Sequence, residues 1–295
     1  MLTHLQIVPS APKRVVILGA HGFVARELIK ALQTAQVDVL PVSSRELDLS
    51  ESSAATALQN LLRVDDTVVM TAAITPDKSR DVHALMKNLR MGEQVALALS
   101  AQPCAHFIYI SSDAVYDWTH SLVSEATRPS PTDLYSLMHL AREKVLTQAA
   151  TTARVPFCIL RPSAIYGAGD THNGYGPNRF LRSARAEHKI RLFGQGEETR
   201  DHVFIYDVIK IIELTLRHRS TGILNAVSGC SISFGALAGL VQRLGGESVV
   251  IESQPRSGPV THRHFDPTAL QRGFPDHRPT GLEIGLNIVW TNPMA

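Results

Sequence analysis

Short apolar runs alternate with amphipathic stretches through the first half of the chain, and turn-forming residues bound each run. Continuous apolar runs of about four to eight residues are typical of inner parallel strands that are covered on both faces. The pattern predicts strands at 14–19, 37–43, 67–72, 105–111 and 156–161. It predicts helices at 23–35, 53–62, 79–101 and 133–152. Strands that alternate with helices in this way indicate an α/β fold with a doubly wound parallel sheet.

The pattern changes after Pro162, where glycine- and asparagine-rich segments separate shorter elements. We expect helices at 179–188, 234–244 and 280–290 and short strands near 248–252 and 260–265. Loops at the carboxyl ends of strands are where open α/β sheets bind ligands. We therefore expect a dinucleotide-binding domain over 1–162, to whose sheet 203–227 returns, and a smaller C-terminal substrate-binding lobe made of 163–202 and 228–295.

The segment from Arg14 to Ala25 has the pattern of a buried strand, a glycine-bounded turn and a helix. Gly19 and Gly22 allow a tight turn and a close approach of the backbone to a pyrophosphate. The N–H groups that open the helix at Phe23 and Val24 would hold that charge. The G-x-x-G-x-x-A pattern predicts a Rossmann-type dinucleotide site. The alternative is a plain strand-turn-helix corner, because such corners also favour glycine.

Composition and charge exclude several classes of function. A formal net charge of +2 over 295 residues is too small to indicate nucleic acid or a membrane surface as a partner. No apolar run approaches the roughly 18 residues of a membrane span, and the first dozen residues lack a signal-peptide layout. The three cysteines lie far apart without metal-ligand spacing, and we expect them to be buried thiols of a reducing, cytoplasmic compartment: Cys104, Cys158 and Cys230. No metal site is expected.

Several segments resemble the extended short-chain dehydrogenases/reductases, which are NAD(P)-dependent sugar-nucleotide epimerases, dehydratases and reductases. FIYISSDAVYD at 107–117 is similar to their strand-end signature. PTDLYSLMHLAREKV at 131–145 matches their P-x-x-x-Y-x-x-x-K-x-x-x-E helix except at the lysine. Four further segments resemble the family in the same order along the chain: NLRMG at 88–92, RPSAIYGAG at 161–169, GQGEETRDHVFIYDV at 194–208 and PRSGPVTHRHFDPTAL at 255–270.

The resemblance implies that Tyr135 is the catalytic base and that Ser112 hydrogen-bonds the same substrate oxygen. A tyrosine with a pKa of about 10 is nearly all protonated at neutral pH, so the family places a lysine one helical turn on, whose charge lowers that pKa. His139 occupies this position here. It lies on the same helix face as Tyr135 and can hydrogen-bond a nicotinamide ribose, but a neutral histidine does not supply the charge. The alternative is a cofactor-binding protein, a sensor or scaffold with weak or no catalysis, in which His139 fills space.

The resemblance also suggests which dinucleotide binds. An acidic side chain at the end of the second strand accepts hydrogen bonds from the adenosine ribose of NAD. Ser43 stands at that position, and Ser44 and Arg45 follow. Small hydroxyls and an arginine suit a 2'-phosphate, so NADP(H) is favoured over NAD(H), unless Arg45 is only a solvated loop cation. The expected cofactor-binding set is completed by Asp48 and Leu49, which resemble the pair that flanks the adenine, and by Ala72 and Ala73.

For the substrate, Arg200 and Arg256 fall on arginines that hold the diphosphate of a nucleoside-diphosphate sugar in the family. The fixed fork of donors on a guanidinium suits this role, and a surface ion pair is the alternative for each. Asn178 is similar to an asparagine near the start of the substrate-lobe helix. The implied function is an NADP(H)-preferring oxidoreductase that transfers a hydride at a hexose ring carbon, C4, as an epimerase or a reductase. The resemblance suggests a homodimer formed through the helix of Tyr135 and its neighbour.

Overall fold

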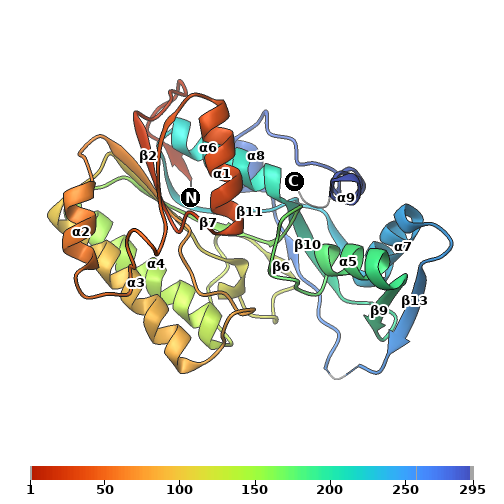
Figure 1. Ribbon diagram of the computed structural model, residues 1–295. Coiled ribbons are helices and arrows are strands. Elements are labelled where there is room, and N and C mark those ends of the chain that lie inside the picture. Colours follow the sequence, from red (N-terminus) through yellow and green to blue (C-terminus); the bar gives the residue numbers. More distant parts are fainter. Residues whose placement is uncertain (1, 257, 293–295) are drawn as a thin grey trace.

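A mostly parallel sheet forms the centre of the larger part of the molecule (Figure 1). The computed structural model describes residues 2–256 and 258–292. The strands of this sheet are β1 (Thr3–His4), β2 (Arg14–Leu18), β3 (Asp38–Val42), β4 (Asp66–Met70), β5 (His106–Ile110), β7 (Phe157–Pro162) and β11 (Ser220–Ala226). Their order is β1-β11-β7-β5-β4-β2-β3, and every neighbouring pair is parallel except β1 and β11. This arrangement confirms the expected Rossmann-type doubly wound fold.

Alternate residues of each inner strand are buried on opposite faces of the sheet, as the period of two requires. In β2, Val15 and Ile17 belong to one core, together with residues of α1 (Phe23–Thr34) and α6 (Ile205–Arg217). Val16 and Leu18 belong to the other core, which is completed by α2 (Ala54–Leu61), α3 (Val82–Ala101) and α4 (Leu134–Ala153). Burial on both faces explains why these strands are continuous apolar runs.

β2 lies between β3 on one side and β4 on the other. The chain passes first from β2 to β3 and then crosses to the other side of β2 to form β4. The crossover helices α1 and α2 lie against opposite cores, which leaves a crevice at the carboxyl ends of β2 and β4. The predicted helix at 79–101 starts later than expected, at Val82. The reason is local, because the Asp81 carboxylate accepts a hydrogen bond from the Ala84 N–H at 2.8 Å and caps the helix there.

Shorter elements form the smaller part of the molecule, on the right of Figure 1. A three-stranded sheet contains β8 (Ala164–Tyr166), β10 (Thr199–Phe204) and β12 (Ser231–Ser233). Two further pairs are β9 (Lys189–Phe193) with β13 (Val250–Gln254), and β6 (Leu122–Val123) with β14 (His264–Phe265). The helices of this part are α5 (Pro177–Glu187), α7 (Phe234–Gly245) and α9 (Leu282–Thr291), whereas α8 (Thr268–Gly273) packs against β11 of the large sheet. A 3-10 turn, η1 (Asp113–Val115), follows β5 and contacts α4.

Sequence patterns were less informative in this part of the chain. The strand expected at 260–265 is reduced to β14, because its partner β6 is only two residues long. The expectation of three buried thiols is wrong for Cys230, which is exposed in the turn between β11 and β12, whereas Cys104 and Cys158 are buried. Within the described ranges, no helix is both long and apolar enough to cross a membrane.

Candidate active site

The turn after β2 brings bare backbone to the crevice of the sheet. Gly19 has a φ of 94°, and a Cβ atom there would lie 2.7 Å from the backbone of Ala72, so no other residue fits without strain. The Gly22 N–H donates to the Gly19 carbonyl at 2.9 Å and closes the turn. Among the residues that the structure describes, no side chain caps the start of α1. Its first N–H groups can therefore bind an anion, as a pyrophosphate site requires.

A cavity of about 290 Å³ extends from this turn over the ends of β3 and β4. Most of the expected cofactor-binding residues line it: Gly19, Gly22, Ser43, Ser44, Asp48, Leu49, Ala72 and Ala73. Arg45 is exposed and does not line it, whereas Lys78 and Lys87 do. Lys87 Nζ lies 3.7 Å from Asp48 Oδ2. This end of the site therefore combines small side chains with two cations at its rim.

A second cavity of about 430 Å³ continues from the first, and both are lined by His21, Gly22 and Thr71. The three expected catalytic residues, Ser112, Tyr135 and His139, line this cavity, as do Phe23 and Val24. Tyr135 and His139 lie on α4. Ser112 follows β5 and is the N-cap of η1, where its Oγ accepts from the Ala114 N–H at 3.1 Å. The fold thus brings the dinucleotide turn and the expected acid-base residues to one continuous groove.

The first turn of α4 fixes Tyr135. Asp133 accepts from the Ser136 N–H at 2.7 Å, and Ser136 Oγ accepts from the Asp133 N–H at 3.0 Å, which makes a reciprocal cap. Burial raises the pKa of Tyr135 well above its usual value, and the neighbouring Tyr109 and Asp113 raise it further. Hydrogen bonding to Ser112 lowers it only in part. The free protein therefore holds Tyr135 as the neutral phenol at pH 7.

His139 is buried beside Tyr135, and its ring meets the Tyr135 ring edge-on at a centroid distance of 4.7 Å. Its Nδ1 lies 2.7 Å from Tyr109 Oη, and its Nε2 is buried with no hydrogen-bond partner among the described residues. Burial, helped by the charge of Arg142, lowers the pKa of His139 to about 3, so the ring is neutral at pH 7. The unpartnered Nε2 fits a hydroxyl of a bound dinucleotide.

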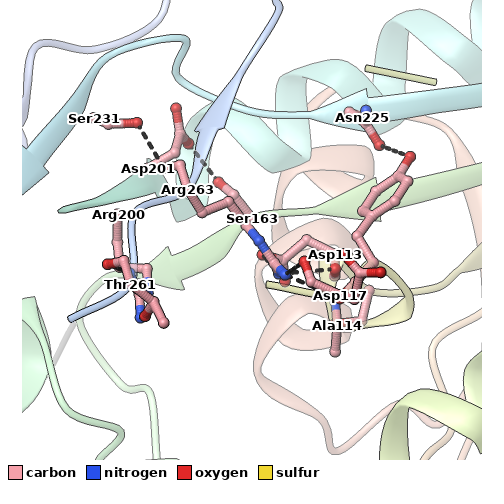
Figure 2. A network of polar contacts seen from close by, with 12 residues as sticks. Asp113, Ala114, Asp117, Ser163, Arg200, Asp201, Asn225, Ser231, Thr261 and Arg263 are labelled. Atoms are coloured by element: carbon pink, nitrogen blue, oxygen red, sulfur yellow. Dashed lines mark hydrogen bonds and ion pairs between the residues drawn. The ribbon is translucent and has the colours of Figure 1, made fainter. Parts of the chain in front are cut away.

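Beyond the cavity, two guanidinium groups share one aromatic ring. Arg200 stacks on Trp118 with its guanidinium carbon 4.4 Å from the ring centroid, and Arg263 stacks on it at 3.8 Å. Figure 2 shows Arg263 extending toward Asp113, whose carboxylate lies 3.5 Å away, and Arg200 beside Thr261, to whose carbonyl it donates at 2.8 Å. Burial and the charge of Arg263 lower the pKa of Arg200. Arg263 already has Asp113 as a partner, whereas within the described residues no carboxylate lies within 4.0 Å of Arg200, so Arg200 could bind an anion.

The structure does not bring Arg256 or Asn178 to these cavities. Arg256 forms ion pairs with Glu197 and Glu198. Asn178 Oδ1 accepts from the Gly167 N–H at 3.2 Å, and its Nδ2 donates to Asp170 at 2.6 Å. Both side chains are thus engaged by neighbours within the protein.

Sequence reasoning missed Arg263 and Asp113. Arg263 alternates with Phe265 in the strand expected at 260–265, so the period of two could have indicated that both point inward. Asp113 follows the end of the strand expected at 105–111 by two residues, and such positions face the ligand crevice of an open sheet. Asp113 lines the larger cavity, where burial raises the pKa of its carboxyl group.

Comparison with known proteins agrees with this fold. The chain is 25% identical over 253 residues to an ADP-L-glycero-D-manno-heptose-6-epimerase from Cupriavidus pinatubonensis, covering 77% of this chain and 76% of that protein. RMD from Pseudomonas aeruginosa, solved with NADPH, is similar in structure with a TM-score of 0.81 and 21% identity over 95% of this chain and 98% of the other. A UDP-glucose 4-epimerase from Thermotoga maritima, solved with UDP-glucose, has a TM-score of 0.79 and 18% identity over 94% and 97% of the two chains.

Residues 15–226 match the NAD dependent epimerase/dehydratase family. This range contains the glycine turn, Ser112, Tyr135 and the strands of the central sheet from β2 to β11. The chain therefore belongs to the NAD-dependent epimerase/dehydratase family and is an NAD(P)-dependent enzyme.

Proposed function

We propose that this enzyme transfers a hydride at C4 of the hexose of a nucleoside-diphosphate sugar, as an epimerase or a reductase. The observation that carries the proposal is the continuity of the dinucleotide groove with the cavity at Ser112 and Tyr135. Asp113 connects this cavity to the Arg200–Trp118–Arg263 cluster. A dinucleotide turn, a proton-transfer pair and an anion-binding pair thus follow one another in the order that a sugar nucleotide would need.

Tyr135 and Ser112 would move the proton. Ser112 would hydrogen-bond the reacting oxygen of the sugar, and the Tyr135 phenolate would accept its proton as the adjoining carbon is oxidised. NAD(P), when bound, supplies the hydride acceptor. Gly19, the first N–H groups of α1 and His139 Nε2 would hold and orient it. Because burial raises the pKa of Tyr135 and His139 is neutral, we expect slow turnover at neutral pH and a rate that rises with pH.

Arg200 is our candidate for the diphosphate, because it faces another cation and lies within 4.0 Å of no carboxylate among the described residues. The expected roles of Arg256 and Asn178 in substrate binding stay predictions. Arg256 would have to exchange Glu197 and Glu198 for the substrate, at the cost of two existing ion pairs. Asn178 would have to release Gly167 or Asp170.

We further propose a preference for NADP(H) over NAD(H). β3 is followed by Ser43 and Ser44 rather than by an acid, and the exposed Arg45 comes next. Lys78 and Lys87 at the rim of the same cavity would add to the attraction for a 2'-phosphate. The nearest acid in sequence, Glu46, accepts hydrogen bonds from the Ser43 N–H and Oγ and is thereby turned toward the protein.

Calorimetric titration with both cofactors tests this preference. Arg45→Ala should weaken NADP(H) binding roughly tenfold or more and leave NAD(H) unchanged, because it removes a charged hydrogen bond of about 1.5–3 kcal/mol to a phosphate that NAD lacks. Glu46→Gln is the matched variant. If Glu46 instead binds the ribose of NAD, this change would weaken NAD(H) selectively, and equal or tighter binding of NAD(H) to the unaltered enzyme would contradict the preference.

Activity is tested with a panel of sugar nucleotides that differ at C4 or at C6, because the relatives are named for reactions at different carbons. A reductase would oxidise NADPH, whereas an epimerase would change the sugar without net consumption of cofactor, which NMR of the product detects. The neutral His139 favours the second candidate, a cofactor-binding protein that acts as a sensor or scaffold. Tight cofactor binding without turnover across the panel would support that candidate.

Exposed apolar side chains on α3 and α4 support a homodimer, which we also propose. They are Val82, Met86 and Leu97 on α3 and Leu137 and Val145 on α4. A second copy of this chain would cover them. Light scattering should give twice the monomer mass for the unaltered protein and a smaller mass for Leu137→Asp.

The two-lobe division and the cellular setting complete the proposal. We propose that 163–202 and 228–295 bind the substrate, because β10 carries Arg200 and the segment before β14 carries Arg263. We also propose a reducing, cytoplasmic setting, because all three cysteines are free thiols and Cys230 is exposed.

A further inference from the structure

Arg142 is a buried cation next to the catalytic residues, and the proposed reaction gives it no role. It is 1% exposed and lies on α4, on the same helix face as Tyr135 and His139 because the three positions are spaced by four and three residues. Its guanidinium donates to three backbone or amide oxygens: Asn88 O at 2.7 Å, Ala72 O at 2.8 Å and Asn88 Oδ1 at 3.2 Å.

This cation has no anionic partner in the part of the chain that the structure describes, since no carboxylate lies within 4.0 Å of it. A buried charge is costly unless an opposite charge lies beside it. Arg161, another buried arginine that contacts α4, forms a two-pronged ion pair with Glu143 at 2.6 and 2.9 Å. The fold also makes room for Arg142, because a Cβ atom on Gly92 of α3 would lie 2.9 Å from Arg142 Cγ. A positive charge thus lies buried directly behind Ala72, which lines the cofactor cavity, and behind Asn88, which lines a small cavity together with Tyr135.

Tyr135 is surrounded by Tyr109 from β5, Ser112 and Asp113 at η1, and His139 and Arg142 from α4. Other charged or titratable side chains line the cavities that Tyr135 also lines: His21, Arg26, Asp77, Lys78, Arg80, Asp81, Asp170 and His172. Arg26, Lys78 and Arg80 are exposed, whereas Arg142 is a buried cation, and His139 is neutral at pH 7. The negative charge of Asp113 disfavours the phenolate form of Tyr135, and the positive charge of Arg142 favours that form.

We propose that Arg142 is a positioning residue that supplies the fixed positive charge which the lysine of the Y-x-x-x-K pattern would otherwise give, and that it thereby favours the ionised form of Tyr135. This inference rests on the proposed role of Tyr135 as the base. His139 then contributes Nε2 to the cofactor, while Arg142 contributes the charge from the next turn of the helix. One lysine is replaced by two residues with separate tasks.

Arg142 also has a structural task, which the test must separate from the electrostatic one. It holds the carbonyl of Ala72, and the Asn88 side chain that it contacts holds both the N–H and the carbonyl of Ile74 at 2.9 and 3.0 Å. Loss of Arg142 would therefore loosen the wall of the cofactor cavity. Arg142→Lys keeps the charge and loses the fork, whereas Arg142→Met loses both and keeps an unbranched apolar stem.

The first experiment measures the ionisation of the phenol at position 135 directly, so it does not require catalysis. Tyr135 is replaced by a trifluorotyrosine, whose phenol is more acidic, and its titration is followed by ¹⁹F NMR in the full-length protein. Arg142→Met should move the midpoint upward by about one pH unit, as expected for the loss of a nearby opposite charge. In Arg142→Lys the midpoint should rise by no more than about half of that shift, because the positive charge is kept. Equal midpoints in the unaltered and Arg142→Met backgrounds would overturn the proposal.

The second experiment is a charge rescue. Arg142→Met should lower kcat at neutral pH about tenfold and shift the pH profile upward, because one pKa unit corresponds to about tenfold in the ionised fraction. The double variant His139→Lys/Arg142→Met should recover most of that loss. Loss of activity that His139→Lys does not recover, in a double variant with unchanged cofactor binding, would show that Arg142 is only structural. Turnover that survives in Tyr135→Phe would instead refute the proposed function, and the fluorine titration would still report on Arg142.

Discussion

The two ends of the groove are built in different ways. The cofactor end is lined by backbone and small side chains from the turn after β2 and from the ends of β3 and β4. The proposed substrate end lies beyond the larger cavity and consists of long charged and aromatic side chains, with Arg200 on β10, Trp118 after η1 and Arg263 before β14. Backbone shape alone suffices for a pyrophosphate, since N–H groups are available in every sequence. The proposed substrate, a sugar nucleotide, would require particular side chains, and those of this cluster come from segments far apart in the chain.

Replacing Tyr135 by phenylalanine should separate chemistry from binding and give the largest effect. We expect kcat to fall roughly a hundredfold to ten-thousandfold, the contribution of a general base, while the dissociation constant for NADP(H) changes little. Single-turnover assays and calorimetry on the same variant measure the two quantities. Ser112→Ala should lower kcat by a smaller factor than Tyr135→Phe. Activity that persists in Tyr135→Phe would mean that another group is the base.

A single methyl group should break the cofactor end. Gly19→Ala places a Cβ atom 2.7 Å from the backbone of Ala72 at a φ of 94°. We expect a loss of roughly 1–3 kcal/mol in the free energy of unfolding and about a hundredfold weaker cofactor binding. Ser44→Ala, at the exposed rim of the same cavity, is the control and should change stability little. Normal cofactor affinity in Gly19→Ala would remove the argument for close backbone approach.

The substrate end should respond to side chains rather than to backbone. Arg200→Ala should raise the dissociation constant of a nucleoside diphosphate about tenfold to a hundredfold, because it removes a charged hydrogen bond of about 1.5–3 kcal/mol. Arg256→Ala, measured in parallel, should have the smaller effect, since Glu197 and Glu198 already occupy that guanidinium. The reverse order would assign the diphosphate to Arg256. Calorimetry on folded variants decides between them.

Acid should lower the free energy of unfolding through three buried neutral histidines, of which His139 lines the larger cavity, and we expect the smallest effect of the series here. Burial lowers the pKa of His139 and His202 to about 3 and that of His106 to about 4. Below about pH 6.5 these histidines bind protons in the unfolded chain but stay neutral in the folded protein. The free energy of unfolding therefore decreases as the pH falls toward the pKa values of the folded protein. Each ring contributes at most about 1.4 kcal/mol per pH unit. Denaturant unfolding of His139→Gln between pH 7 and pH 4 should show a shallower decline, and an unchanged slope would contradict the burial argument.

The difference between the two ends also explains how far sequence reasoning reached. Gly19, Ser43 and Ala72 follow apolar runs directly, so a strand pattern places them at the same edge of the sheet. Tyr135 and His139 share a helix face through local spacing alone. Alternation with Phe265 could have indicated that Arg263 points inward, but it could not place Arg263 beside Asp113. That placement needed knowledge of which strand pairs with which, because β14 is two residues long and its partner lies more than a hundred residues earlier.

The amino-acid sequence by itself determined the α/β fold, the glycine turn and the Tyr135–His139 spacing, because these depend on periodicity and on local backbone conformation. Tertiary structure alone decided three features. It engaged Arg256 and Asn178 with protein neighbours, it joined Arg200 and Arg263 at Trp118, and it buried Arg142 on the helix face of His139 with no carboxylate within 4.0 Å among residues 2–256 and 258–292. The physical reason is that the energy of a charge depends on its surroundings. Burial and partners arise only when segments distant in the chain pack together.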